Sequence, residues 1–295
     1  MDLRLTLGVL GRGPHDPTTK WDVAGLWRTF LTPLGAVTLR LTQTRVGVDA
    51  LAWGPGAHWA LDGLPELLGA SDDWSALDVS AHPLLTEVRR RTAGLRLPRT
   101  RRVFEALAPA VIEQKVTSLE AYRSWVRLLR AHGAVAPGPA PGGMRVAPSA
   151  EAWRRIPSWE WHRTGVDPQR SRSLVTAARV ASGLERTAEL VGGMPLPGEV
   201  VAARLRSVSG IGVWTAAETA QRAHGDPDAV SVGDYGLAAI VGYALTGSTT
   251  DDDGMLELLA PWSGQRQRVV RLIGASGVVP PRHGPRATIT DHRRR

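Results

Sequence analysis

The stretch 205-LRSVSGIGVWTAAETAQRAHGDPDAVSVGDYGL-237 decides the fold of this chain. Apolar residues lead into the turn Gly210-Ile211-Gly212, and an unbroken run of helix-forming residues begins at Trp214. Glycine permits the tight, partly left-handed backbone that such a turn needs. The stretch therefore predicts two helices joined by a hairpin. The second helix would begin with free N–H groups that suit a phosphate oxygen.

A single carboxylate, Asp234, ends the stretch. It stands 20 residues after Trp214, preceded by Val232-Gly233 and followed by Tyr235. One helix and one loop of that length can bring the carboxylate back beside the hairpin. A half-buried carboxylate can stabilise a developing positive charge or orient a water molecule. The alternative interpretation is an Asp that caps the next helix, and both roles can coexist.

The hairpin Val208 to Ala216, followed by Asp234 at this spacing, resembles the helix-hairpin-helix glycosylase superfamily of base-excision repair. Ser209 stands where the family usually has proline, which should soften the turn without removing it. Residues 113–116 (EQKV) resemble the family's GQQVS segment, and residues 261–266 (PWSGQR) resemble its Pro-Trp segment. The N-terminal third, with RGP and AWGPGA, is similar to the 3-methyladenine DNA glycosylase II-like branch of high-GC bacteria.

The resemblance implies a monofunctional DNA N-glycosylase that flips alkylated bases, of the 3-methyladenine or 7-methylguanine type, out of damaged double-stranded DNA. Bifunctional members carry a lysine at the position of Trp214, where it attacks the sugar as an amine. An indole cannot form a Schiff base, so water is the expected nucleophile and no lyase activity is expected. Other lesions (hypoxanthine, uracil or oxidised purines) and a non-catalytic DNA-binding protein remain alternative interpretations.

The resemblance also assigns site residues. Asp234 is the expected catalytic residue. Cationic alkylated purines would stack on an aromatic lesion pocket, although core packing is the plainer interpretation of each ring. The loop that fills the gap left by the flipped base contains Gln114 and Lys115, and Lys115 replaces the usual apolar wedge; a solvated loop is the alternative. The expected pocket is Trp214, Tyr235 and Trp262; the phosphate-binding hairpin is Ser209, Gly210, Ile211, Gly212 and Thr215; and the carbonyls of Arg206, Val208 and Ile211 would hold a monovalent cation when DNA is bound.

The predicted fold class is α+β, with a small N-terminal antiparallel sheet domain (residues 1–78), an all-helical two-lobed domain (residues 79–277) and a basic, flexible tail (residues 278–295). Residues 1–7 alternate like a strand. The Pro/Gly-rich residues 134–144 predict a linker without regular structure. Trp153, Trp159 and Trp161 are expected in the core.

Composition limits the possible functions. The 295 residues contain no cysteine, which excludes disulfides and the cysteine-ligated iron–sulfur cluster of some superfamily members; no other cofactor is expected. The net charge of +8 favours a polyanionic partner, although arginine-rich composition also follows from a GC-rich genome. Residues 251–253 (DDD) predict an acidic helix start rather than a metal site. The sequence shows no signal-like or membrane-spanning run, so we expect the protein in the bacterial cytoplasm. We also expect it to be a monomer.

Overall fold

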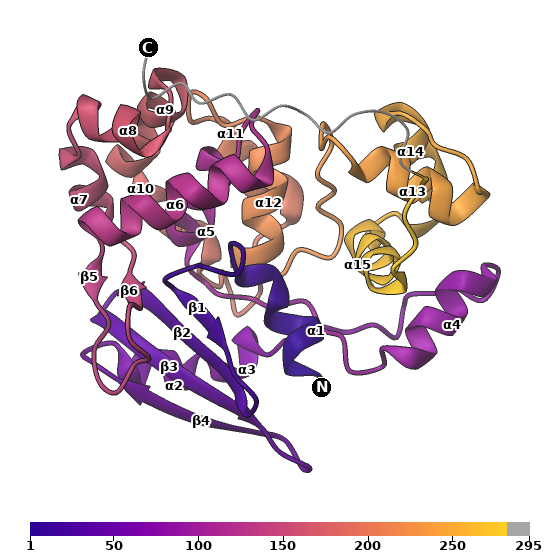
Figure 1. Cartoon of the computed structure of the whole chain (residues 1–295). Helices are drawn as coiled ribbons and strands as arrows, with labels where there is room; N and C mark the ends of the chain where they lie inside the picture. The colour runs from indigo at the N-terminus through magenta and orange to yellow at the C-terminus, as the bar shows by residue number, and fades with distance from the viewer. Residues whose placement is uncertain (282–295) are drawn as a thin grey trace.

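The structure, a computed structural model, describes residues 1–281. A four-stranded antiparallel sheet is followed by a mainly helical part (Figure 1), so the predicted α+β class is confirmed. Most of the basic tail predicted for residues 278–295 lies outside the described residues. Within residues 1–281 no helix combines the length and the apolar character needed to cross a bilayer.

The sheet is a meander in the order β1-β2-β3-β4. One face, with Leu26, Leu39 and Leu41 fully buried, packs on the N-terminal helix and on the helices that follow β4. The opposite face is covered by residues 136–146, because Thr29 and Thr38 donate hydroxyl hydrogen bonds to carbonyls there at 2.5 and 2.6 Å. The elements of this domain are β1 (Thr19–Trp21), β2 (Gly25–Thr32), β3 (Gly35–Gln43), β4 (Val48–Trp53), α2 (Ala57–Asp62) and α3 (Leu64–Leu67).

The strand predicted at the N-terminus is wrong: residues 3–7 form helix α1 (Leu3–Leu7), followed by the 3₁₀ turn η1 (Gly8–Leu10). The Asp2 carboxylate caps α1 by accepting the Leu5 N–H at 2.8 Å. Leu3 and Leu7 lie one helical turn apart and both enter the core of the sheet domain, whereas Leu5 packs on a different cluster. The alternating leucines thus pack into two different hydrophobic cores. On a strand, all three would lie on the same face.

The linker predicted at residues 134–144 is partly wrong, because two short strands border it. β5 (Ala134–Val135) pairs antiparallel with β6 (Arg145–Val146). Arg145 donates its N–H to the Pro17 carbonyl at 2.8 Å, and its own carbonyl accepts the Thr29 hydroxyl. The sheet domain therefore orders a segment whose composition alone predicts no structure.

The larger helical lobe surrounds α5, nearly every residue of which is buried. The ring of Trp153 stacks between those of Trp125 and Trp161, with centroids 6.2 and 5.5 Å apart. Trp159 is 69% exposed, which corrects its predicted core position; two residues before Trp161 on the same helix, it faces the opposite way. The lobe contains α5 (Val103–Ile112), α6 (Ser118–His132), α7 (Ala150–Arg155), α8 (Ser158–Thr164), α9 (Pro168–Arg179), α10 (Ala181–Glu185), η2 (Arg186–Ala188), α11 (Gly198–Arg206) and α12 (Val213–Ala223).

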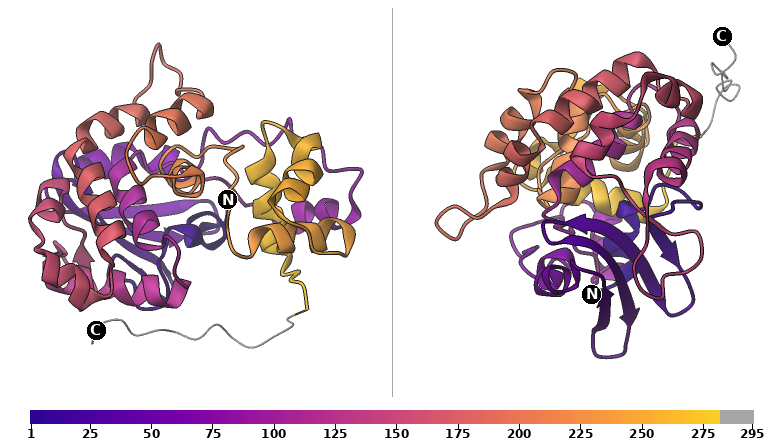
Figure 2. Two further views of the ribbon diagram at one scale, coloured as in Figure 1. Left: turned by 90° about the horizontal axis from the view of Figure 1, so that it is seen from above. Right: turned by 90° about the vertical axis from the view of Figure 1, so that its left-hand side faces the viewer.

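The smaller lobe combines segments far apart in sequence, as Figure 2 shows at its right in the left-hand view. Leu85 and Val88 pack with Met255, Leu259 and other residues from the C-terminal helices in one buried cluster. As predicted, the acidic run begins a helix, with the Asp251 carboxylate accepting the Gly254 N–H at 3.0 Å. The elements are α4 (Pro83–Arg91), α13 (Leu237–Thr246), α14 (Asp252–Leu259), η3 (Ala260–Trp262) and α15 (Arg266–Ser276).

His224, the residue that follows α12, should make the free energy of unfolding depend on pH. Burial and the nearby charge of Arg99 lower the His224 pKa from 6.5 to about 4, and the contact with Thr187 opposes this only partly. Between these two values the unfolded chain binds a proton that the folded chain does not, so the free energy of unfolding falls as the pH falls. His224→Gln should remove up to about 3 kcal/mol of this dependence in urea titrations from pH 7 to 4.

The matched control for this experiment is His58→Gln, since the His58 side chain is 85% exposed. It should keep the wild-type slope of unfolding free energy against pH. Equal slopes for wild type and His224→Gln would contradict the assignment.

Candidate active site at the hairpin

The predicted hairpin is present, with α11 and α12 joined by residues 207–212. Helix α12 packs closely against α5 because its inward face carries small residues, Ala216, Ala220 and Ala223, which are all buried. Gly212, in extended backbone, precedes α12, and within residues 1–281 no side-chain cap bonds the first N–H groups of this helix. An uncapped helix start on an exposed turn is well suited to bind an anion.

Gly210 is required at the tip of this turn. Its φ of +87° lies in the left-handed region, and an added Cβ would stand 2.0 Å from the Ser173 Oγ on α9. The hairpin thus approaches α9 more closely than any side chain allows. Behind the turn, the Ile211 N–H donates to the Val208 carbonyl at 3.0 Å.

The structure brings Asp234 beside Trp214. The indole Nε1–H of Trp214 donates to Asp234 Oδ2 at 3.1 Å, while Oδ1 accepts the N–H groups of Gly236 and Leu237 at 3.0 and 3.1 Å. One oxygen therefore caps the start of α13 and the other is held by the first turn of α12. The side chain is half-buried, so both interpretations of Asp234, cap and oriented carboxylate, are compatible with its geometry.

The loop that carries Asp234 is fastened to α12 at a second place. The Ser231 hydroxyl donates to Glu218 Oε1 at 2.6 Å, and Gln221 donates to that hydroxyl at 2.8 Å. Burial raises the pKa of Glu218, but the charge of Arg222 and the Ser231 hydrogen bond outweigh it, so this pKa lies below its usual range. Asp234 is thus held to the same helix through Trp214 and through Ser231.

The three aromatic rings predicted to form a pocket do not come together. Tyr235 is fully exposed, at 104% of its reference area. Trp262 packs against the core of the smaller lobe and donates its indole N–H to the Asp78 carbonyl at 2.6 Å. Within residues 1–281 no ring contact joins either of them to Trp214. Of the three predicted pocket residues, Trp214 is the one whose side chain bonds the Asp234 carboxylate, whereas Tyr235, the next residue in the chain, is exposed to solvent.

The predicted DNA-entering residues lie between α5 and α6, next to the hairpin. Gln114 donates its amide to the Gly210 carbonyl at 3.0 Å and to the Thr215 hydroxyl at 2.8 Å. Lys115 is exposed and adopts a left-handed φ of +54°. Thr117 caps α6 in a full capping box with Glu120. Gln114 therefore contacts the hairpin, while Lys115 projects from the segment.

The proposed cation site at the hairpin stays a prediction. The Val208 carbonyl accepts the Ile211 N–H, and a carbonyl oxygen keeps a second lone pair for a cation. With the carbonyls of Arg206 and Ile211, this donor set consists of neutral oxygens, which fits a monovalent cation held jointly with a phosphate.

Known structures share this architecture, although no protein-family model and no curated protein matches the sequence. The 3-methyladenine DNA glycosylase from Archaeoglobus fulgidus superposes with a TM-score of 0.73 at 17% identity, over 94% of this chain and 95% of that chain. The chain has the DNA glycosylase fold. The Clostridium acetobutylicum 8-oxoguanine glycosylase/lyase in complex with DNA gives a TM-score of 0.70 at 12% identity, over 93% and 91% of the two chains. The Schizosaccharomyces pombe 3-methyladenine DNA glycosylase in complex with abasic DNA gives a TM-score of 0.51 at 19% identity, over 69% of this chain and 94% of that chain.

Three residues that hold the Asp234 loop against α12 were not predicted from the sequence. Glu218, Gln221 and Ser231 fasten the loop after α12, and none belongs to the motif. One signal was available: Glu218 follows Trp214 by four residues, so the two side chains share a helix face. The motif alone gave no reason to look for a partner on the loop.

Proposed function

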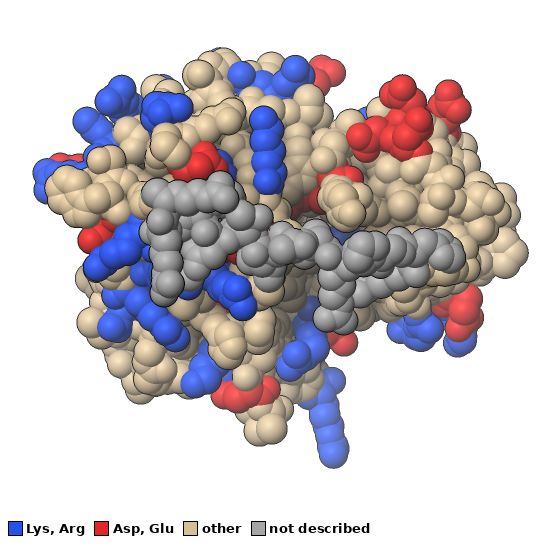
Figure 3. All heavy atoms as spheres, turned by 45° about the horizontal axis from the view of Figure 1, so that its top comes forward, with Lys and Arg blue, Asp and Glu red and all other residues tan. Residues whose placement is uncertain are grey.

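We propose that this chain is a monofunctional DNA N-glycosylase, which extrudes a damaged base from duplex DNA and hydrolyses its glycosidic bond. The observation that carries the proposal is the Asp234 carboxylate held by the Trp214 indole beside an uncapped helix start. The glycosylase fold adds support. On the face drawn in Figure 3, Lys and Arg side chains are more frequent over the left-hand part of the molecule than over the right-hand part, and positive charge favours binding of a polyanion such as DNA.

In this mechanism the N–H groups at the start of α12 bind a phosphate next to the lesion. A monovalent cation on the hairpin carbonyls would add a positive charge there. Asp234 faces the sugar, which becomes positively charged as the base departs, and it stabilises that charge and orients the attacking water. The indole N–H orients the carboxylate without neutralising it. Trp214 offers no amine, so the reaction ends at an abasic site.

Alkylated purines of the 3-methyladenine or 7-methylguanine type are the proposed substrates. They are cationic, so their glycosidic bonds are already weak and Asp234 would need little help from a general acid. Two of the similar structures are 3-methyladenine DNA glycosylases. The similar 8-oxoguanine glycosylase/lyase favours an oxidised purine as the second candidate.

Release of free base tests the proposal. Wild-type protein should release 3-methyladenine and 7-methylguanine from methylated duplex DNA, and faster than it releases base from duplexes containing hypoxanthine, uracil or 8-oxoguanine. Borohydride should trap no covalent protein–DNA adduct. Faster release of 8-oxoguanine would favour the second candidate, a trapped adduct would contradict the monofunctional mechanism, and DNA binding without release of any base would leave a non-catalytic protein.

Trp214→Phe should lower the rate of base release by about ten- to a hundredfold, because the lost hydrogen bond to a charged partner contributes on the order of 1.5–3 kcal/mol. Single-turnover release from methylated DNA measures the effect. Trp27→Phe is the matched control: its indole donates to the Asp22 carboxylate at 3.0 Å in the sheet domain, far along the chain from the site. An equal loss in both variants would contradict a specific role for the Trp214 bond.

A further inference from the structure

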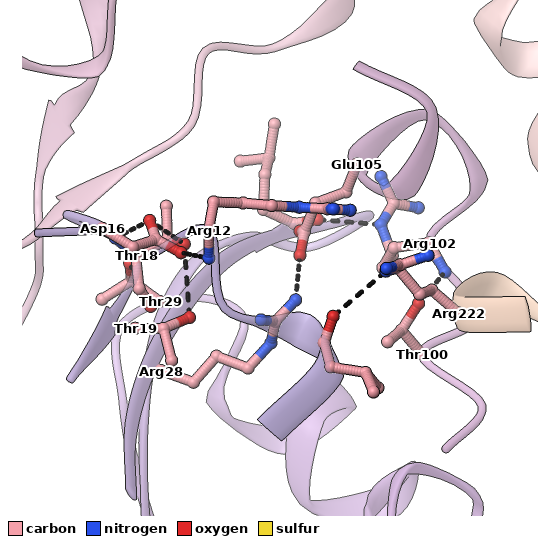
Figure 4. A network of polar contacts seen from close by, with 12 residues as sticks. Arg12, Asp16, Thr18, Thr19, Arg28, Thr29, Thr100, Arg102, Glu105 and Arg222 are labelled. Atoms are coloured by element: carbon pink, nitrogen blue, oxygen red, sulfur yellow. Dashed lines mark hydrogen bonds and ion pairs between the residues drawn. The ribbon is translucent and has the colours of Figure 1, made fainter. Parts of the chain in front are cut away.

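A loop of the sheet domain, residues 11–18, lies against α6. The Asp16 carboxylate accepts the Arg12 N–H at 2.8 Å through one oxygen and the indole N–H of Trp125 at 3.0 Å through the other. A Cβ on Gly13 would stand 2.6 Å from the ring of Tyr122. These contacts fix the backbone of Arg12 on the helical lobe. Figure 4 shows the Asp16 carboxylate at the Arg12 backbone.

The Arg12 side chain continues from this anchor to the end of α5. Its Nη1 donates to both carboxylate oxygens of Glu113, at 2.9 and 3.2 Å, and the two side chains are only 6% and 14% exposed. Burial raises the pKa of Glu113, and the charge of Arg12 opposes that shift. Glu113 is the first residue after α5. An ion pair from the sheet domain therefore holds the start of the segment that carries Gln114 and Lys115.

That segment is held at three points. Arg12 binds Glu113 at its start, the hairpin binds Gln114 in its middle, and the capping box of Thr117 closes its end. Lys115 stands between these points with a left-handed backbone, which costs a non-glycine residue on the order of 1–2 kcal/mol. Such a conformation persists only where its surroundings hold it.

We propose that Arg12 is a positioning residue for DNA binding: through Glu113 it holds residues 113–117 in the conformation that presents Lys115 to the duplex. This inference rests on the proposed function, in which the segment enters the DNA beside the extruded base. It gives the sheet domain a role in substrate binding in addition to its role as a scaffold.

The chain offers a closely matched control. Arg28 on β2 pairs with Glu105 on α5 at 2.6 Å, and these side chains are 8% and 15% exposed. Both pairs join an arginine of the sheet domain to a glutamate of the α5 region. Figure 4 shows the control pair, with Arg28 pointing at Glu105. Glu105 lies in the first turn of α5, however, at the opposite end from Glu113.

The test compares two double variants, Arg12→Met/Glu113→Gln and Arg28→Met/Glu105→Gln. Each removes both charges of its pair, which avoids leaving one buried charge without a partner. The measurements are KM and kcat for base release, Kd for a duplex containing a tetrahydrofuran abasic site, and the melting temperature. The first variant should raise KM and Kd about tenfold with kcat within twofold of wild type. The second variant should keep KM, kcat and Kd within twofold of wild type. Its melting temperature should be similar to that of the first variant.

Wild-type KM and Kd in the Arg12/Glu113 variant, or equal increases in both variants, would overturn the proposal. Arg12→Lys keeps the charge but loses the planar guanidinium group, so it should raise Kd about threefold. This variant replaces the double variant in the test if the double variant does not fold. If wild type releases no base, the proposed function fails separately. The Kd comparison still decides the role of Arg12.

Discussion

Asp234→Asn should lower base release by about 10³-fold while duplex binding stays within twofold of wild type. The carboxylate is proposed to stabilise the positive charge that develops on the sugar, and removal of one such group typically costs two to four orders of magnitude in rate. Asparagine keeps an oxygen that can accept the N–H groups of Gly236 and Leu237, and Asn and Asp are similar helix caps. The Nδ2 group that replaces Oδ2 cannot accept the Trp214 indole N–H, however, so the free energy of unfolding should fall by about 1.5–3 kcal/mol.

The control for this variant is Asp251→Asn, which changes another capping aspartate, at the start of α14. It should release base at the wild-type rate. If both variants lose activity equally, the effect of Asp234→Asn comes from capping. If Asp234→Asn releases base as fast as wild type, Asp234 is not the catalytic residue.

Gly210→Ala should destabilise the protein by about 3 kcal/mol, because it combines left-handed strain with overpacking against α9. The new Cβ would meet Ser173 at 2.0 Å from Oγ and 2.7 Å from Cβ, and Ser173 is buried. The hairpin must move to relieve this clash, so affinity for duplex DNA should fall at least tenfold. Urea denaturation and fluorescence anisotropy with a labelled duplex measure the two effects.

Gly212→Ala separates the clash from a general effect of glycine replacement. Gly212 has a φ of −90°, and no atom lies within 4 Å of an added Cβ. The free energy of unfolding should change by no more than about 1 kcal/mol. Equal destabilisation by the two alanine substitutions would contradict the close packing of the turn on α9.

Local patterns predicted much of this fold. The glycine turn and the helix-forming run after it located the hairpin between α11 and α12, and the acidic run at residues 251–253 located the start of α14. Period-two alternation failed at residues 1–7, where the leucines are divided between two hydrophobic cores and a helix satisfies both. That division depends on the position of the smaller lobe, which no local pattern contains.

The site could be predicted only near the motif. The spacing from Trp214 placed Asp234 beside α12, and the structure joins them by a hydrogen bond. Trp262 belongs to the smaller lobe, whose packing is set by α4 from earlier in the chain, so its distance from the motif could not be read from sequence. The ion pairs of the basic run at residues 99–102 could not be predicted either, because their partners lie far away in the sequence. Arg99 pairs with Glu66, and Arg102 pairs with Glu185.

The most direct test of the central claim, that Asp234 stabilises a positively charged sugar, uses two abasic duplexes. One contains a neutral tetrahydrofuran ring and the other a cationic pyrrolidine ring, which mimics the charge of the transition state. Wild type should bind the cationic duplex at least tenfold more tightly, and Asp234→Asn should bind both alike. Equal affinities in the wild type, or an undiminished preference in the variant, would contradict the account.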